Sequence, residues 1–339
     1  MPVRNLFLQF VGPVAEIKHP LETHGQTVTL RAHMLAFIFR RLLSSALVLF
    51  CVVSVTVLLS FVMKGGPFDR EKPPPEHIQK ALLARYKLSG TTWERYTSYM
   101  SDLVRGDLRA SFRYRDWTVN EVLAQKMPNS IKLGAVAFVI ASVGGVLLGS
   151  LAALKRDGLV DWAAMFGALL LISVPTFITG PCLIAVFGLW LKVLPVGGWG
   201  RWEHVILPAC CLAGPYLAYV ARLMRNSLLE VMKSEFMRTA RAKGVSDMQA
   251  LAKHAMKVAI LPVVTFLGPL AANLLTGSMV VETVFNISGA GTVFVNSLQN
   301  RDYFLLVGAV AVYCALVILF NFIVDVLYGF LDKRIKVYG

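Results

Sequence analysis

The chain has 339 residues, of which 56% are hydrophobic and 16% charged, and its mean hydropathy is +0.62. Soluble domains carry charge on about a quarter of their residues, so this composition excludes an ordinary soluble domain and predicts a protein that lies in lipid. The formal net charge is +14. Because the basic residues lie between long apolar runs and not on one face of a soluble fold, we expect no nucleic-acid partner.

Six apolar runs are long enough to cross a membrane, since a helix needs about 20 apolar residues to span a hydrocarbon core about 30 Å thick. The five cysteines all lie within these runs, where they indicate neither disulfides nor a metal site. We therefore predict an all-α membrane protein that binds no metal or cofactor. The six predicted transmembrane helices are at about 42–63, 131–154, 163–191, 205–224, 261–281 and 304–327.

The distribution of Lys and Arg predicts the orientation, because short cytoplasmic loops are enriched in these residues. With the N-terminus inside, the short outer loops contain only Lys192, Arg201 and Arg301. The sequence thus predicts that both termini are cytoplasmic. The first apolar run lacks the pattern of a cleaved signal peptide, so we interpret it as a retained helix. Four basic stretches then face the cytoplasm, at 40–41, 155–156, 222–257 and 333–336.

Residues 64–128, between the first two predicted helices, form a long external segment. Apolar residues at helical spacing follow three prolines, and Thr91 with Glu94 forms a capping-box pattern before a second such stretch. This predicts two amphipathic helices that end near Gly106. Their buried faces could cap the outer mouth of the protein or dock a partner, and periodicity alone does not distinguish these roles.

The cytoplasmic loop at 225–258 is short, basic and structured. Residues 234–243 predict a helix that ends at Gly244 in the C′ position, with Arg238, Arg241 and Lys243 near its negative end. A second capping-box pattern at 246–249 starts another helix at once. Such a rigid projection suits insertion into a groove of another protein, although a basic loop could also merely fix the topology.

The same loop resembles a known family. The run Arg238-Thr239-Ala240-Arg241-Ala242-Lys243-Gly244, followed by His254 and by Leu261-Pro262, is similar to the EAA loop of binding-protein-dependent ABC importer permeases of the dipeptide and oligopeptide branch. Arg238 replaces the Glu of the broader family's signature, as is usual in the peptide branch. Further similar stretches are at 114–120, 194–199, 276–282, 300–303 and 321–328.

The resemblance covers about residues 34–339, the permease domain, and is strongest to the first of the two permease subunits of oligopeptide importers. Residues 1–33 have no counterpart, so we interpret them as an N-terminal cytoplasmic extension or the product of a start codon placed too early. The resemblance implies a type I ABC importer permease fold in the bacterial inner membrane. It also implies four kinds of partner: a second permease subunit, two ATPase subunits, a soluble peptide-binding protein and an oligopeptide substrate.

The resemblance implies that this chain moves substrate by alternating access but is not an enzyme. The sequence has no G-x-x-x-x-G-K-S/T phosphate loop, so we expect ATP to be bound by the partner chains. Motion of the ATPases would reach the membrane through a coupling loop. The residues assigned to that loop are Arg238, Thr239, Ala240, Arg241, Ala242, Lys243, Gly244, His254 and Pro262.

Small or polar residues within the predicted helices could line a peptide-sized path, because a dehydrated peptide backbone needs hydrogen-bond partners. Each could equally be a helix-packing residue. The substrate could also be a dipeptide, a nickel chelate, an opine or a sugar. The candidate path residues are Pro175, Thr176, Thr179, Tyr216 and Ser278.

Two other classes of protein compete with this interpretation. An ion-coupled secondary transporter usually has ionisable residues at the bilayer midplane, whereas Lys132, Glu282 and Asp325 lie near the ends of predicted helices, where snorkelling or helix-end packing explains them. A membrane enzyme would need a nucleophile-base pair or a metal cluster, and the histidines are scattered outside the helices or at their edges.

Overall fold

The computed structural model describes residues 26–62, 75–114, 116–244, 249, 251 and 255–331. All regular elements in this part of the chain are helices, with one isolated β-bridge between Ala110 and Thr118. In chain order they are α2 (Gln26–Val62), α3 (Glu76–Arg85), α4 (Thr92–Val104), α5 (Val119–Val139), η1 (Ile140–Gly144), α6 (Gly145–Leu154), α7 (Leu159–Ser173), α8 (Thr176–Leu183), η2 (Ile184–Trp190), α9 (Glu203–Met232), α10 (Glu235–Ala242), α12 (Met256–Ala259), α13 (Leu261–Leu275), α14 (Met279–Val284), α15 (Ala290–Gln299) and α16 (Tyr303–Leu331).

Five continuous helical segments are long and apolar enough to cross a membrane, and one bent pair of helices can form a sixth span. The prediction of an all-α protein is therefore confirmed, the predicted number of six spans is reached if the bent pair is one span, and several predicted boundaries are wrong. The second span begins at residue 119 because the polar residues before 131 continue the same helix. The five segments are Ile38–Phe61, Val119–Leu154, Glu203–Met232, Met256–Leu275 and Tyr303–Ile323.

The region that the sequence predicts as one spanning helix at 163–191 is two helices in the structure. The chain bends by 112° between Leu159–Ser173 and Thr176–Trp190. Val174 has extended backbone angles, φ −91° and ψ 120°, and Pro175 follows it. Proline disfavours the helical conformation of the preceding residue and supplies no N–H, so the helix ends there.

The fifth span ends at Leu275 and not at 281. Gly277 has φ +86°, a left-handed conformation that glycine adopts without strain, and a separate short helix, α14, follows it. Ser278 is therefore the N-cap of α14 and not a residue within the span, and its Oγ accepts a hydrogen bond from the backbone N–H of Val281 at 3.3 Å.

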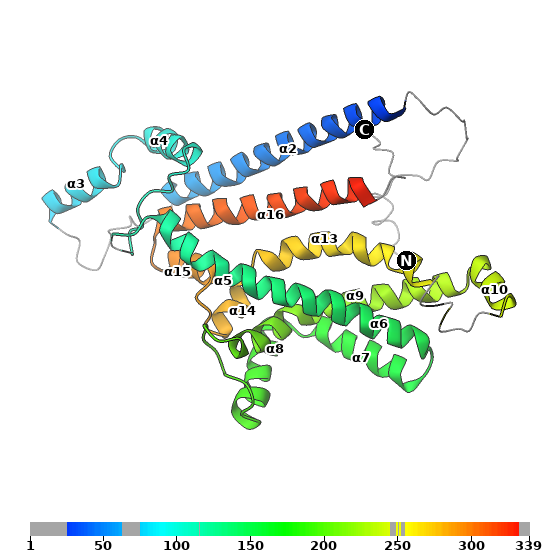
Figure 1. The fold of residues 1–339 in the computed structure, drawn as a ribbon. Helices are drawn as coiled ribbons and strands as arrows, with labels where there is room; N and C mark the ends of the chain where they lie inside the picture. The colour runs from blue at the N-terminus through cyan, green and yellow to red at the C-terminus, as the bar shows by residue number, and fades with distance from the viewer. Residues whose placement is uncertain are drawn as a thin grey trace.

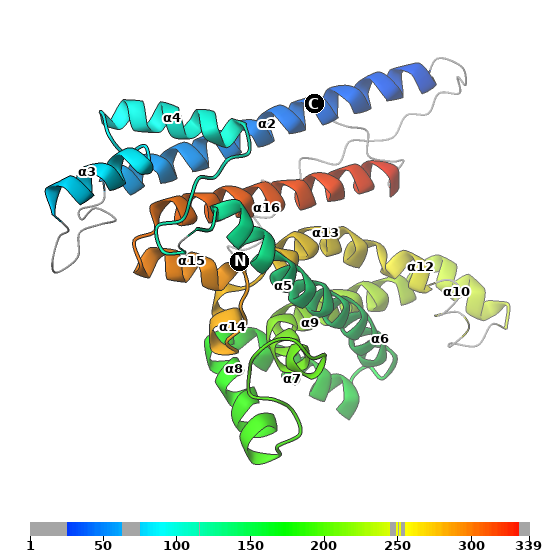
Figure 2. The ribbon, with the colours of Figure 1, turned by 60° about the vertical axis from the view of Figure 1, so that its left-hand side comes forward.

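Helix α9 lies in the centre of the bundle, packed against α5, α6, α7 and α13 (Figure 1). Most of the apolar core surrounds it, and residues such as Met224 and Leu228 are fully buried there. A second core joins α2 and α16, which run side by side in both views (Figures 1 and 2), to α4 and the start of α5.

The two predicted amphipathic helices after the first span are present as α3 and α4. The capping box of Thr91 and Glu94 is formed as expected. Arg109 lies beneath α4, where its Nε donates to Asp102 at 2.9 Å and its guanidinium lies 5.1 Å from the ring centre of Phe304, in α16. These contacts attach α4 to the start of α16. The α3–α4 segment and α10 lie at opposite ends of the bundle (Figures 1 and 2).

Candidate functional site

The predicted start of the coupling loop at residue 225 is wrong, because residues 225–232 are the last turns of α9. The helix α10 follows and extends from one end of the bundle (Figure 1). Its bounds, Glu235–Ala242, agree with the predicted helix at 234–243 to within one residue at each end. Only Lys233 and Ser234 separate it from α9. Met237 is fully buried in the core around α9, so a single side chain fixes the first turn of α10 to the bundle.

The remaining described side chains of this segment point to solvent. Arg238 is exposed and forms an ion pair with Glu235 at 2.9 Å, and Thr239 and Lys243 are also exposed. Gly244 follows in the left-handed region with φ +80°, as the C′ prediction requires. A short, basic and solvent-exposed helix is thus available to contact another protein.

Other parts of the predicted loop lie outside the described residues. These are His254, most of the helix predicted to begin at 246, and the side chains of Ala240 and Arg241. Pro262 is described, and it occupies the first turn of α13, where the missing N–H of proline has no cost.

The five candidate path residues occur on three elements that contact one another, α8, α9 and α14. Pro175 and Thr176 start α8 at the bend, and the Cys211 thiol in α9 lies 3.6 Å from the backbone oxygen of Thr176. Thr179 is half-buried and its hydroxyl donates to the Pro175 carbonyl at 3.3 Å. Among the described residues, no hydrogen bond joins two of the five side chains, so the structure groups their helices without assembling a site from them.

A buried polar cluster that the sequence did not predict lies where α5, α14 and α15 meet. Glu282, in α14, is fully buried. One carboxylate oxygen accepts a hydrogen bond from the Ser130 hydroxyl in α5 at 2.7 Å, and the other accepts from the backbone N–H groups of Gly291 and Thr292 at 2.8 and 3.2 Å. The carboxylate therefore lies at the positive end of α15, which favours its charge.

Ser130 completes the cluster, because its Oγ also accepts a hydrogen bond from the backbone N–H of Ala290 at 2.8 Å. Of the two explanations for Glu282, snorkelling and helix-end packing, the structure supports helix-end packing. Glu282 belongs to the stretch at 276–282 that resembles the permease family. Its hydrogen-bond partner Ser130 is 152 positions away, and the sequence around Ser130 does not predict this contact.

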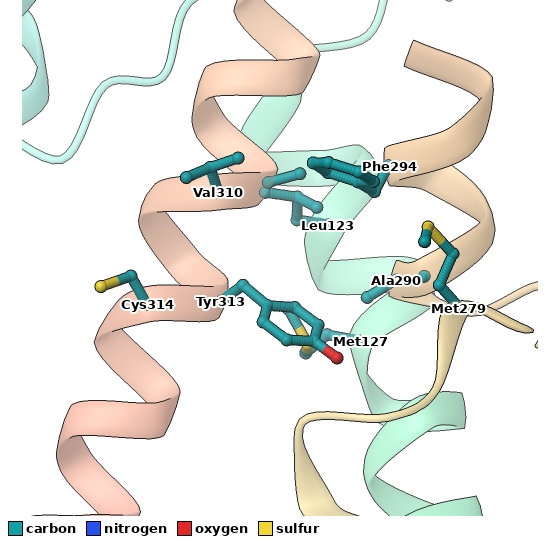
Figure 3. Close-up of a pocket in the computed structure, with 10 residues that line it drawn as sticks. Leu123, Met127, Met279, Ala290, Phe294, Val310, Tyr313 and Cys314 are labelled. Atoms are coloured by element: carbon teal, nitrogen blue, oxygen red, sulfur yellow. The ribbon is translucent and has the colours of Figure 1, made fainter. Parts of the chain in front are cut away.

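A cavity of about 320 Å³ lies beside this cluster, between α5, α15 and α16 (Figure 3). Tyr313 points into it from α16 and Phe294 from α15, and the Tyr313 hydroxyl donates to the Gly277 carbonyl at 2.7 Å. Its lining contains no charged residue. The lining residues are Leu123, Met127, Met279, Ala290, Gly291, Phe294, Ala309, Val310, Tyr313 and Cys314.

Known proteins resemble this chain over most of its length. The oligopeptide transport system permease protein OppB of Haemophilus influenzae is 42% identical over 305 residues, which cover 89% of this chain and 100% of that protein. OppB of Escherichia coli K12 is 40% identical with the same coverage. The dipeptide transport system permease protein DppB of Bacillus subtilis is 39% identical, covering 90% of this chain and 99% of that protein.

A solved structure of the MetNI methionine ABC transporter in an inward-facing conformation has a similar fold, with a TM-score of 0.53 at 17% identity. The match covers 62% of this chain and 97% of the compared chain, and it confirms the expected type I ABC permease fold. Residues 145–337 match the family described as "Binding-protein-dependent transport system inner membrane component". The chain therefore belongs to this family of multi-pass inner-membrane permeases, and its role is transport.

Proposed function

We propose that this chain is the permease subunit of a bacterial ABC importer that moves oligopeptides across the inner membrane by alternating access. A second, different permease subunit would complete the path, two separate ATPase subunits would bind ATP, and a soluble peptide-binding protein would deliver the substrate. The similarity to OppB proteins over their whole length carries the proposal of an oligopeptide substrate.

The position of α10 supports the proposed coupling role. Contact with an ATPase requires an exposed element that is firmly attached to the bundle. Helix α10 combines the exposed Arg238 with the buried anchor Met237, and the exposed Lys243 follows it directly. Displacement of α10 would then move α9, since the two-residue turn between them leaves little chain to absorb motion.

We also propose that α10 faces the cytoplasm and the α3–α4 segment faces outward, with both termini inside. The opposite ends that the two elements occupy agree with this orientation (Figures 1 and 2). Reporter fusions after Lys155 and near Arg105 test it. The first is expected to be cytoplasmic and the second external, and a cytoplasmic signal near Arg105 would contradict the orientation.

Replacement of Gly244 tests the coupling role. Gly244→Val introduces a β-branched side chain where φ is +80°, so the chain after α10 must leave its observed path. We expect the complex to reach the membrane and to bind loaded binding protein, but to lose peptide-stimulated ATP hydrolysis. Gly244→Asn is the control, because asparagine adopts the left-handed region at low cost.

Equal stimulation of ATP hydrolysis in the Gly244→Val and Gly244→Asn variants would contradict a coupling role for this turn.

The substrate class needs a separate measurement, because DppB is also similar to this chain. Uptake into proteoliposomes that contain the whole complex, with its binding protein, compares a labelled pentapeptide with a labelled dipeptide. We expect uptake of the pentapeptide, and uptake of the dipeptide alone would favour dipeptide import.

A further inference from the structure

A buried ion pair joins the start of α7 to α9. Arg225, in α9, donates from Nε to Oδ1 of Asp161 at 2.5 Å and from Nη2 to Oδ2 at 2.6 Å. The Asp161 side chain is 6% exposed and the Arg225 side chain 20%. The backbone N–H of Asp157 also donates to Oδ2 at 3.0 Å. Both carboxylate oxygens are therefore bonded, and the guanidinium binds in the two-pronged geometry that fixes orientation as well as distance.

Arg225 belongs to the part of α9 that must move with the coupling helix. Downstream of it, α9 continues to Met232 and turns at once into α10. Met237 of α10 packs in the same core as Met224 and Leu228, which flank Arg225 in sequence. A displacement of α10 therefore reaches Arg225 through a continuous helix and a shared core.

Asp161 belongs to the broken span. It lies in the first turn of α7, which runs to the bend at Pro175 and continues into α8, the helix that contains Thr176 and Thr179. Among the described residues, the Asp161–Arg225 contact is the only side-chain hydrogen bond between α7 and α9. The remaining contact between the two helices is apolar, and apolar packing is non-directional.

The difference between a directional ion pair and non-directional apolar packing gives the Asp161–Arg225 pair a specific role. Apolar surfaces can slide past each other by small steps, whereas a two-pronged ion pair has a single geometry, and separating its partners leaves a buried charge without a counter-charge. The pair therefore fixes the position of α7 along α9. When α9 moves, α7 must move with it or break the pair.

We propose that Asp161 and Arg225 are positioning residues for energy coupling, which carry the displacement of α10 and α9 to α7 and the broken span. This inference rests on the proposed function, since it requires an ATP-driven importer. It assigns a mechanical role to two residues that are not among the residues assigned above to the coupling loop or to the substrate path. The pair lies within the bundle, between α10 and the bend, along the path that such motion would follow.

The test measures, in the reconstituted complex, the ratio of ATP hydrolysis with loaded binding protein to hydrolysis without it. This ratio does not depend on how much complex assembles, so a purely structural loss does not change it. We expect Arg225→Met and Asp161→Asn to lower it about tenfold. Arg225→Lys keeps the charge but not the two-pronged contact, and we expect an intermediate value.

Arg156→Gln is the matched control. Arg156 forms an exposed pair with Asp157 close to the same turn, and we expect a wild-type ratio from this variant. If the Arg225→Met variant does not assemble into the complex, the hydrolysis ratio of the Arg225→Lys variant tests the proposal. A wild-type ratio in the assembled Arg225 variants would overturn the proposal. Absence of peptide uptake by the wild-type complex would instead overturn the proposed function.

Discussion

Gly134 lies where the backbones of α5 and α13 approach closely. A Cβ atom at this residue would lie 2.0 Å from the carbonyl oxygen of Leu274 and 2.8 Å from the Cα of Leu275. Both are backbone atoms, so no side-chain rotation can make room. A carbon atom and a carbonyl oxygen need about 3.3 Å. Gly134→Ala must therefore push α13 away by roughly 1 Å or more.

The expected change in the free energy of unfolding on Gly134→Ala follows from two opposed effects. Overpacking costs about 1–3 kcal/mol and occasionally more, and a clash with backbone belongs at the upper end. Alanine gains about 1 kcal/mol over glycine within a helix. We expect Gly134→Ala to lower the free energy of unfolding by about 2 kcal/mol. Gly167→Ala is the control, because no atom lies within 4 Å of its Cβ position in α7, and we expect it to be neutral or slightly stabilising.

Thermal unfolding of the purified protein in detergent, followed by intrinsic fluorescence, measures the difference. The Gly134→Ala midpoint is expected several degrees below that of Gly167→Ala. Equal midpoints would show that α13 can move away from α5 without loss. The close contact of the two helices would then contribute nothing to stability.

Two further predictions concern buried and partly buried carboxylates. Glu282→Ala removes the acceptor of three hydrogen bonds and should lower the free energy of unfolding by about 3 kcal/mol, whereas Thr283→Ala on the exposed side of α14 should change it by less than about 1 kcal/mol. Equal unfolding midpoints would refute this. For Asp102, burial raises the pKa, but Lys87 and Arg109 outweigh it and keep the pKa below its usual value. This carboxylate therefore stabilises the fold above about pH 4, and the stability is lost as the pH falls through its lowered pKa. Asp102→Asn should be less stable than the wild type at pH 6, and this difference should shrink as the pH falls below about 4. A difference that stays constant across unfolding curves at each pH would contradict the role of the ion pairs that Asp102 forms with Lys87 and Arg109.

The sequence predicts helices well where the signal is local. Apolar length identifies the spans, and the capping box at Thr91 appears as expected. Proline residues predict the ends of helices less well. Pro208 and Pro215 lie inside the continuous helix α9, whereas Pro175 ends α7. The residue type is the same in each case, so neighbouring helices decide whether the freed backbone groups are tolerated, and those neighbours are not visible in a single sequence.

Pairs of distant residues are also invisible to a single sequence. Ser130 and Glu282 are 152 positions apart, and Asp161 and Arg225 are 64 apart. Each residue alone resembles an ordinary polar residue near the end of a span. The coupling turn was predictable because its helix, its C′ glycine and its basic residues are adjacent in the chain.

The bend at Pro175 restricts what can surround the third span. A helix break leaves N–H and C=O groups at both new ends without helical partners, and hydrocarbon cannot supply partners for them. Pro175 is exposed on the surface of this chain and Thr179 is half-buried. Lipid tails therefore cannot solvate this surface in the membrane. We therefore expect any polar group at the break that lacks a partner within this chain to contact water or another protein chain.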